Sequence, residues 1–194
     1  MLNSLRQKIA QTVARFRRDD KAIAAVEFAL IFPFLLTLYF GSIEASALFA
    51  ADRRVNTISA TMGDLVAQWD DDDGAIPVAT MNDYFAASQG LIYPMPSATL
   101  KQVVSCVRVL SDGTTSVVWS RGYNGGTART VNTPYPLAAN TRMNQVARTV
   151  GYIIASETWY SYTPLLSQVF YAPFPLFHEN IYMPRFAARI DAAS

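Results

Sequence analysis

The chain has 194 residues, of which 51% are hydrophobic, and a formal net charge of +1. This length suits one folded domain plus a membrane anchor, and the near-neutral charge does not suggest nucleic-acid binding. Cys106 is the only cysteine, which excludes an intramolecular disulfide. Because Cys106 lies in an apolar run, we expect a small buried thiol, with intermolecular pairing as the less favoured alternative. The domain must then depend on its apolar core or on partners.

A basic leader is predicted for residues 1–22. Residues 1–21 carry six basic and two acidic side chains, a net charge of +4, which leaves −3 for the remainder. Basic residues before a first apolar helix stay on the cytoplasmic side of the membrane, so the C-terminal part is expected to be exported. A plain signal anchor, and a late signal-peptidase cut within residues 47–51, are the alternatives.

The next stretch is expected to span a membrane. Residues 23–51 are mostly Phe, Leu, Ile and Ala, with Glu27 and Glu44 as their only charged residues. The 22 residues from Ala22 to Ile43 cover roughly 33 Å as a helix, enough for a hydrocarbon core of about 30 Å. Glu27 then lies inside the membrane edge, where an unpaired carboxylate costs a few kcal/mol.

Pro33 lies within this apolar stretch. Proline lacks a backbone donor, so the helix is predicted to kink near residues 29–33 without ending there.

Helical character continues through residues 52–69. Apolar side chains recur there at spacings of three and four, namely Val55, Ile58, Met62, Leu65 and Trp69. This periodicity indicates an amphipathic extension of the membrane helix, giving one helix from about residue 24 to 69. The run Asp70–Asp73 ends it, and four adjacent carboxylates favour a solvated turn over a calcium site, which needs ligands at alternate positions.

The predicted fold class is α+β, in which the long helix precedes a small antiparallel sheet within residues 70–194. Residues 78–90 predict a short helix. Residues 100–110 and 115–121 are rich in β-branched side chains and flank a Ser-Asp-Gly-Thr turn at 111–114. This pattern is typical of a hairpin.

The rest of the domain is predicted from turn residues and aromatic runs. Residues 122–140 are rich in Gly, Asn, Thr and Pro, which indicates an exposed loop. Residues 149–162 predict a third strand and residues 170–177 an aromatic loop. Residues 180–189 predict an edge strand interrupted by Pro184.

The sequence contains no recognisable set of catalytic residues. His178, the only histidine, is predicted in an aromatic loop with no nucleophile motif nearby. Metal ligands cluster only in the Asp run, and Gly125-Gly126 does not form a phosphate-loop pattern. We expect no catalytic residue, no metal and no cofactor. An anchored enzyme or ligand binder that uses His178 or the Asp run is the disfavoured alternative.

One motif remains, around Ala22. Ala22 is followed by four apolar residues, then Glu27 and Phe28, then the long apolar stretch. This order resembles the class III prepilin signal, which a membrane peptidase cuts on the cytoplasmic side. The resemblance implies cleavage between Ala22 and Ile23, with Glu27 fifth in the mature chain. The family usually has Gly where this chain has Ala22.

Glu27 has a physical role in such a scheme. Cleavage would leave a charged α-amino group on Ile23. In a stack of parallel helices, Glu27 can reach the amine of its own chain or of a neighbour, which offsets both desolvation costs and sets the axial stagger. The alternative is contact with Lys21 or Arg18 at the membrane edge.

A longer stretch, residues 24–68, resembles the TadE-like and TadF-like pseudopilins of tight adherence (Tad) pilus systems. Matching features are AVEFAL, Pro33, the Gly-x-x-Glu of residues 41–44, Asp-Arg-Arg-Val at 52–55 and Asp-Leu-Val at 64–66. The resemblance does not separate TadE-like from TadF-like proteins.

This resemblance implies a non-catalytic minor pilin or pseudopilin in assembly of a Tad (Flp-type) adhesive pilus. It would be a single-pass protein of the bacterial inner membrane, with a cytoplasmic N-terminus and a periplasmic C-terminal domain. Its implied partners are a prepilin peptidase, pilin and pseudopilin helices and the Tad assembly platform, with no nucleic acid. The alternative is an uncleaved, membrane-anchored periplasmic adaptor of a secretion or envelope complex.

Overall fold

The computed structural model describes residues 20–70, 72, 74–137, 141–165 and 172–193. It forms two compact units, one ending at Ser46 and one beginning at Ala47, and each is described by itself. Most of the predicted leader lies outside the described residues.

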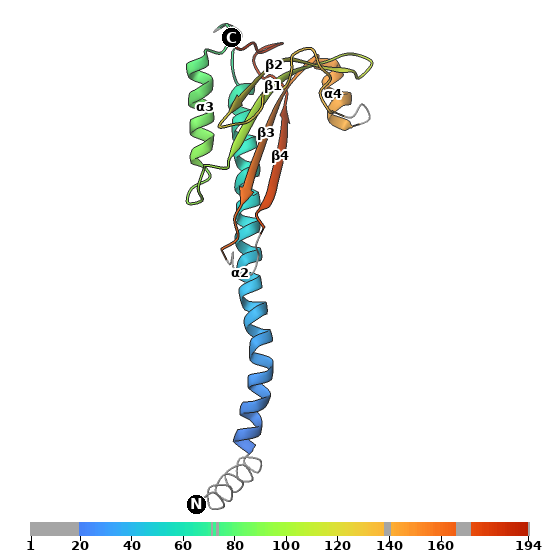
Figure 1. The fold of residues 1–194 in the computed structure, drawn as a ribbon. Coiled ribbons are helices and arrows are strands. Elements are labelled where there is room, and N and C mark those ends of the chain that lie inside the picture. Colours follow the sequence, from blue (N-terminus) through green and yellow to red (C-terminus); the bar gives the residue numbers. More distant parts are fainter. Residues whose placement is uncertain (1–19, 71, 73, 138–140, 166–171, 194) are drawn as a thin grey trace, which may run out of the picture. The chain divides into compact units, whose positions relative to one another are not determined.

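The long helix α2 runs from Asp20 to Ala67 (Figure 1). It confirms the predicted helix, which ends two residues earlier than expected. Pro33 lies inside α2 without ending it, and the hydroxyl of Thr37 donates to the Pro33 carbonyl at 2.9 Å. The predicted kink stays a prediction.

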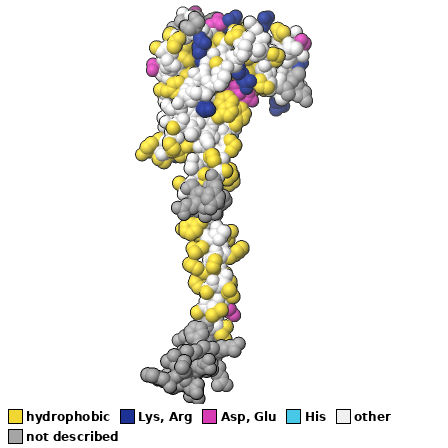
Figure 2. Space-filling view, in the orientation of Figure 1, with side chains coloured by type: hydrophobic (Ala, Val, Ile, Leu, Met, Phe, Trp, Pro, Cys, Tyr) yellow, Lys and Arg dark blue, Asp and Glu magenta, His cyan; other side chains and the backbone are white. Residues whose placement is uncertain are grey.

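In the first unit, the apolar side chains of α2 face outward (Figure 2). Within the described residues, α2 is the one helix long and apolar enough to cross a membrane, and none of its most apolar window is buried. An isolated helix with such a surface suits a membrane anchor.

The second unit contains a four-stranded sheet and two short helices. The strand order is β2-β1-β3-β4, and all neighbours are antiparallel. The elements after α2 are α3 (Val78–Gly90), β1 (Lys101–Val109), β2 (Thr115–Tyr123), α4 (Arg142–Val150), β3 (Tyr152–Tyr162) and β4 (Phe174–Tyr182). The α+β fold class is therefore confirmed.

The predicted short helix and the predicted hairpin are both present, as α3 and as β1 with β2. In the hairpin turn, Gly113 adopts a φ of +88°, a conformation that glycine takes without a steric penalty. The Asp112 carboxylate accepts the Thr114 amide at 2.8 Å, which closes the turn.

Helix α4 was not predicted from the sequence. Its signals are local: the Thr141 side chain accepts the Asn144 amide at the start, and Gly151, with a φ of +87°, ends the helix. Such caps mark helix ends even in short helices. Because α4 extends to Val150, strand β3 begins three residues later than predicted.

The prediction for residues 170–189 was wrong in its boundaries. Strand β4 begins at Phe174 and ends at Tyr182, before Pro184, so residues 174–177 belong to a strand and not to a loop. Pro175 is tolerated because β4 is the edge strand and pairs only with β3.

Alternating side chains give the sheet two different faces. The helix-covered face carries Val104, Cys106 and Ile154, which pack with residues of α2 and α3. The loop-covered face carries Val107 and Ile153, which pack with Tyr135 and with Ala147 of α4. Both faces of the central strands β1 and β3 are therefore buried at the positions of these residues.

The amphipathic part of α2 packs as predicted at the first three positions of the apolar periodicity, but Val66 is buried in place of Leu65, and Trp69 lies beyond the end of the helix. Val55, Ile58 and Met62 are completely buried. Cys106 is also buried, as expected for a lone thiol in an apolar run, and burial raises the pKa of this thiol to about 12.

Gly63 allows α2 to approach the sheet closely. A Cβ at this position would lie 2.7 Å from a ring carbon of Tyr182 and 3.1 Å from Cβ of Ser156. One turn earlier, the hydroxyl of Ser59 donates to the Ser156 carbonyl at 2.7 Å. The absence of a side chain at Gly63 thus sets the distance between helix and strand.

The substitution Gly63→Ala should destabilise the second unit. The added methyl group must displace Tyr182 or the β3 backbone, at a cost of about 1–3 kcal/mol in the free energy of unfolding. Urea unfolding of the full chain in detergent measures this change. Gly90→Ala, where a Cβ meets no atom within 4 Å, is the matched control, and equal unfolding free energies for both variants would refute the role of Gly63.

Candidate functional site

The predicted cleavage site lies within α2. Both Ala22 and Ile23 belong to the helix, which begins at Asp20, and the Ile23 side chain is 48% exposed. The bond between them therefore lies in the first turn of the helix.

Glu27 lies one helical turn after Ile23 and is exposed. Residues four apart share a helix face, so the carboxylate and the end of a chain cut before Ile23 would lie on one side. No hydrogen bond or ion pair joins the Glu27 carboxylate to another described residue. Phe28 is exposed beside it, with its ring centroid 5.3 Å from that of Phe32.

The acidic run is described only in part, because Asp71 and Asp73 lie outside the described residues. The Asp72 amide donates to the Asp70 carboxylate at 3.3 Å, a local turn contact. Among the described residues, no three His, Cys, Asp or Glu side chains gather in a way that could hold a metal ion.

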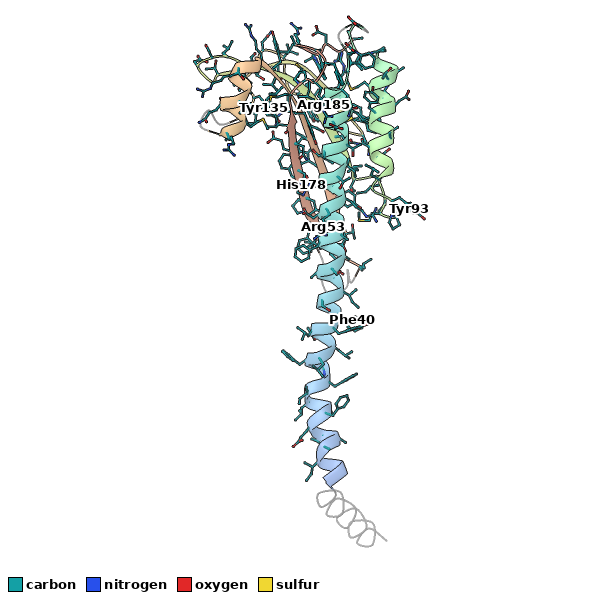
Figure 3. All side chains as sticks on the ribbon, turned by 180° about the vertical axis from the view of Figure 1, so that it is seen from behind. Phe40, Arg53, Tyr93, Tyr135, His178 and Arg185 are labelled. Carbon is teal, nitrogen blue, oxygen red and sulfur yellow. The ribbon has the colours of Figure 1, made fainter. Side chains whose placement is uncertain are left out.

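His178 lies in β4, not in the predicted loop (Figure 3). Its Nε2 atom is 2.8 Å from Oδ1 of Asp52 on α2. The contact joins the edge strand to the helix.

A buried carboxylate lies on the loop-covered face of the sheet. Glu157 in β3 is 1% exposed, and the register places it directly opposite Glu179 in β4. Like charges directly opposite across a sheet repel each other, and a buried carboxylate is costly without a partner. The pair therefore needs compensation from another part of the chain.

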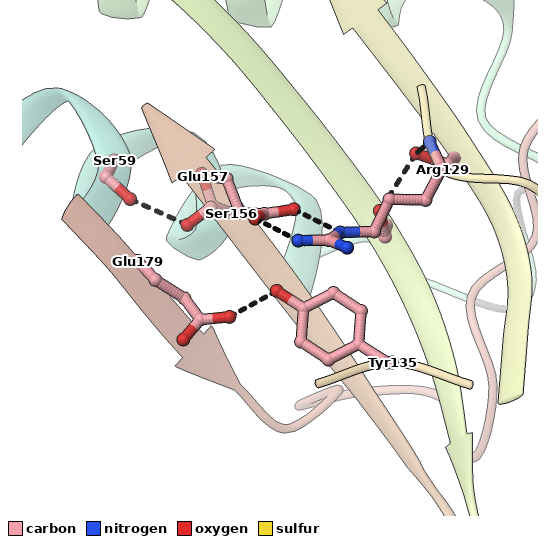
Figure 4. A network of polar contacts seen from close by, with 8 residues as sticks. Ser59, Arg129, Tyr135, Ser156, Glu157 and Glu179 are labelled. Atoms are coloured by element: carbon pink, nitrogen blue, oxygen red, sulfur yellow. Dashed lines mark hydrogen bonds and ion pairs between the residues drawn. The ribbon is translucent and has the colours of Figure 1, made fainter. Parts of the chain in front are cut away.

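The loop after β2 supplies that compensation (Figure 4). Arg129 donates from Nε to one oxygen of Glu157 at 2.6 Å and from Nη2 to the other at 2.5 Å, a bidentate arrangement. The Tyr135 hydroxyl donates to Glu179. The Arg129 guanidinium also lies 4.6 Å from the centre of the Tyr135 ring, at cation–π distance.

These contacts hold Arg129 and Tyr135 each in one protonation state. The hydrogen bond to Glu157 raises the pKa of Arg129, and burial, followed by the bond to Glu179, raises the pKa of Tyr135 above its ordinary value. Arg129 stays a cation and Tyr135 stays a neutral donor. The network thus fastens a loop rich in Gly, Thr and Pro to the sheet.

The sequence carried one signal for this network that was missed. Glu157 stands as the only charged residue in the apolar run 149–162. A charge in a strand that is expected to be buried requires a cationic partner, although the run does not say which one.

Replacing Arg129 by Ala should destabilise the sheet unit strongly. The Glu157 carboxylate would remain buried without a cation, at a cost of about 3–5 kcal/mol in the free energy of unfolding. Urea unfolding of the full chain in detergent measures the loss. Arg142→Ala, at an exposed position of α4, is the control and should change the free energy by less than about 0.5 kcal/mol. Similar losses in both variants would contradict the assignment.

Comparison with known proteins finds a similarity over most of α2. Residues 22–61 match the family model described as TadE-like protein. No curated protein matches the chain, and no solved structure does. The match begins at Ala22, includes Glu27 and Pro33, and ends inside the amphipathic part of the helix. The similarity to the TadE-like family is therefore confined to residues 22–61, within α2.

Proposed function

We propose that the chain is a non-catalytic minor pilin or pseudopilin, which acts in assembly of a Tad adhesive pilus at the bacterial inner membrane. The TadE-like match over residues 22–61 carries this proposal. The matched segment contains the prepilin-like cleavage site and an exposed acid within an exposed apolar helix.

The surface of α2 supports the role of a helix that packs in lipid or against other helices. Between Ile23 and Ile43, large apolar side chains point outward on all sides of the helix. Phe40, for example, projects from α2 (Figure 3). Exposure of such a surface to water carries a high free-energy cost, whereas contact with a bilayer or with neighbouring apolar helices does not.

Glu27 is the only charged residue on this surface. In lipid, its carboxylate requires a cation, and cleavage before Ile23 would create one on each chain. We infer that Glu27 pairs with the new α-amino group of its own chain or of an adjacent pilin or pseudopilin helix. The N-terminus would be cytoplasmic and the sheet unit periplasmic, beside the Tad assembly platform.

Co-expression with the prepilin peptidase of a Tad system should shorten the chain by 22 residues. The physical reason is the small residue Ala22 ahead of the apolar helix, and N-terminal sequencing of the membrane fraction should then begin at Ile23. Ala22→Gly, which restores the residue usual in the family, should be cut at least as well. An intact N-terminus in both variants would favour the uncleaved adaptor.

Replacing Glu27 by Ala should impair pilus assembly without unfolding the sheet unit. Loss of one ion pair in lipid is expected to reduce pilus yield about tenfold, equivalent to about 1.4 kcal/mol. Quantification of sheared pili measures the effect. Glu27→Gln separates charge from shape and should be equally impaired, while protection of Cys106 from thiol reagents verifies folding. Wild-type piliation in both variants would argue against the pairing.

A further inference from the structure

Two contacts join residues 52–54 of α2 to surface segments that are distant in the sequence, namely β4 and the segment after α3. Asp52 contacts His178 of β4 at 2.8 Å. Arg54 donates from Nη1 to the carbonyl oxygens of Leu91 at 3.2 Å and Tyr93 at 2.5 Å. Residues 52–54 are the first charged residues after the apolar run 23–51, apart from the two glutamates within it.

Aromatic rings are exposed at this level. Tyr93 is 78% exposed, and Phe177, the neighbour of His178, is 49% exposed. The Trp159 ring lies 5.1 Å from that of Phe177. Exposed aromatic side chains gathered at one end of a domain mark a contact surface.

Basic side chains accompany these rings. Lys101 is exposed and lies directly opposite Trp159 in the register of β1 and β3. Both line a surface groove of about 390 Å³ that also includes Gly126 and Thr127. Arg53 is exposed on α2. Within the described part of the chain, no hydrogen bond or ion pair engages the Lys101 ammonium or the Arg53 guanidinium.

We call these five residues the aromatic–basic belt: Arg53, Tyr93, Lys101, Trp159 and Phe177. They come from α2, the segment after α3, and strands β1, β3 and β4. Trp159 and Phe177 occupy the next position after Glu157 and Glu179 along the same face of their strands. Residues of the loop after β2 line the groove beside Trp159 and leave its side chain partly exposed.

The composition of the belt matches that of a membrane–water interface. Trp and Tyr concentrate at headgroup level, and Lys and Arg extend their charges to phosphates while their stems cover apolar surface. As a helix, the 29 residues of 23–51 would cover about 43 Å, close to the 40–45 Å of a bilayer with its headgroups. Residues 52–54 then fall at the outer edge of the headgroup layer.

We propose that the aromatic–basic belt rests in the phospholipid headgroup layer of the membrane that α2 enters. Lys101 binds a lipid phosphate at the mouth of the groove, and Trp159, Phe177 and Tyr93 insert beside it. The belt holds the sheet unit against the membrane surface. This inference depends on the proposed membrane anchoring of residues 23–51.

Tryptophan quenching by lipid tests the proposal. The full chain is reconstituted into phosphatidylcholine liposomes whose acyl chains are brominated near the headgroup. Trp159 should be quenched and Trp119, which is almost buried, should not. Trp69 lies just after the end of α2 at Ala67, which is about 22 Å along the helix from Asp52, and should also stay unquenched.

The variants assign the quenching to one residue. Trp159→Phe should abolish it, because the other tryptophans lie away from lipid, and Trp69→Phe should leave it unchanged. Both side chains are partly exposed, and protection of Cys106 from thiol reagents verifies folding. Lys101→Glu should reduce the quenching of Trp159, since a carboxylate is repelled by lipid phosphate.

Three outcomes would overturn the inference. Unchanged quenching in Trp159→Phe would show that another tryptophan meets the lipid. If the wild-type chain floats with the liposomes but shows no quenching, the belt lies in water or against a glycan or partner protein. The proposed membrane anchoring would then be retained and the headgroup contact refuted. A chain that does not float with liposomes would instead refute the membrane anchoring itself.

Discussion

The close contact between the second half of α2 and the sheet is the interaction on which the rest of the second unit depends. Val55, Ile58 and Met62 are completely buried in it, and Gly63 leaves room for Tyr182 and Ser156. These residues belong to the same helix as the exposed apolar segment 23–43. Burial along α2 begins with Glu44 and continues through Ala47 and Leu48 to Ala51.

The opposite face of the sheet is closed by electrostatics as much as by apolar packing. Glu157 and Glu179 face each other across two strands, and this arrangement is stable only because Arg129 and Tyr135 satisfy both carboxylates. One consequence is that the loop after β2 has a fixed place despite its composition. Gly125, Gly126 and Thr127 of the same loop line the groove beside Trp159, whose side chain stays partly exposed.

Taken together, the two units suggest a division of roles. The TadE-like match ends at residue 61, inside α2, and it covers the helix that would pack in lipid or beside other helices. The sheet, the carboxylate network and most of the aromatic–basic belt lie beyond it. In the proposed function, the helix packs in the membrane during pilus assembly, whereas the sheet unit carries most of the aromatic–basic belt.

The sequence by itself determined the elements that rest on local patterns. The periodicity of Val55, Ile58 and Met62 predicted the amphipathic helix, Gly113 predicted the hairpin turn, and the apolar surroundings of Cys106 predicted its burial. The tertiary structure alone decided the placement of β4 and the partners of Glu157 and His178. Arg129 and Glu157 are 28 residues apart, and Asp52 and His178 are 126 apart. No local pattern encodes such pairs, because the side chains meet only after the strands have taken their register.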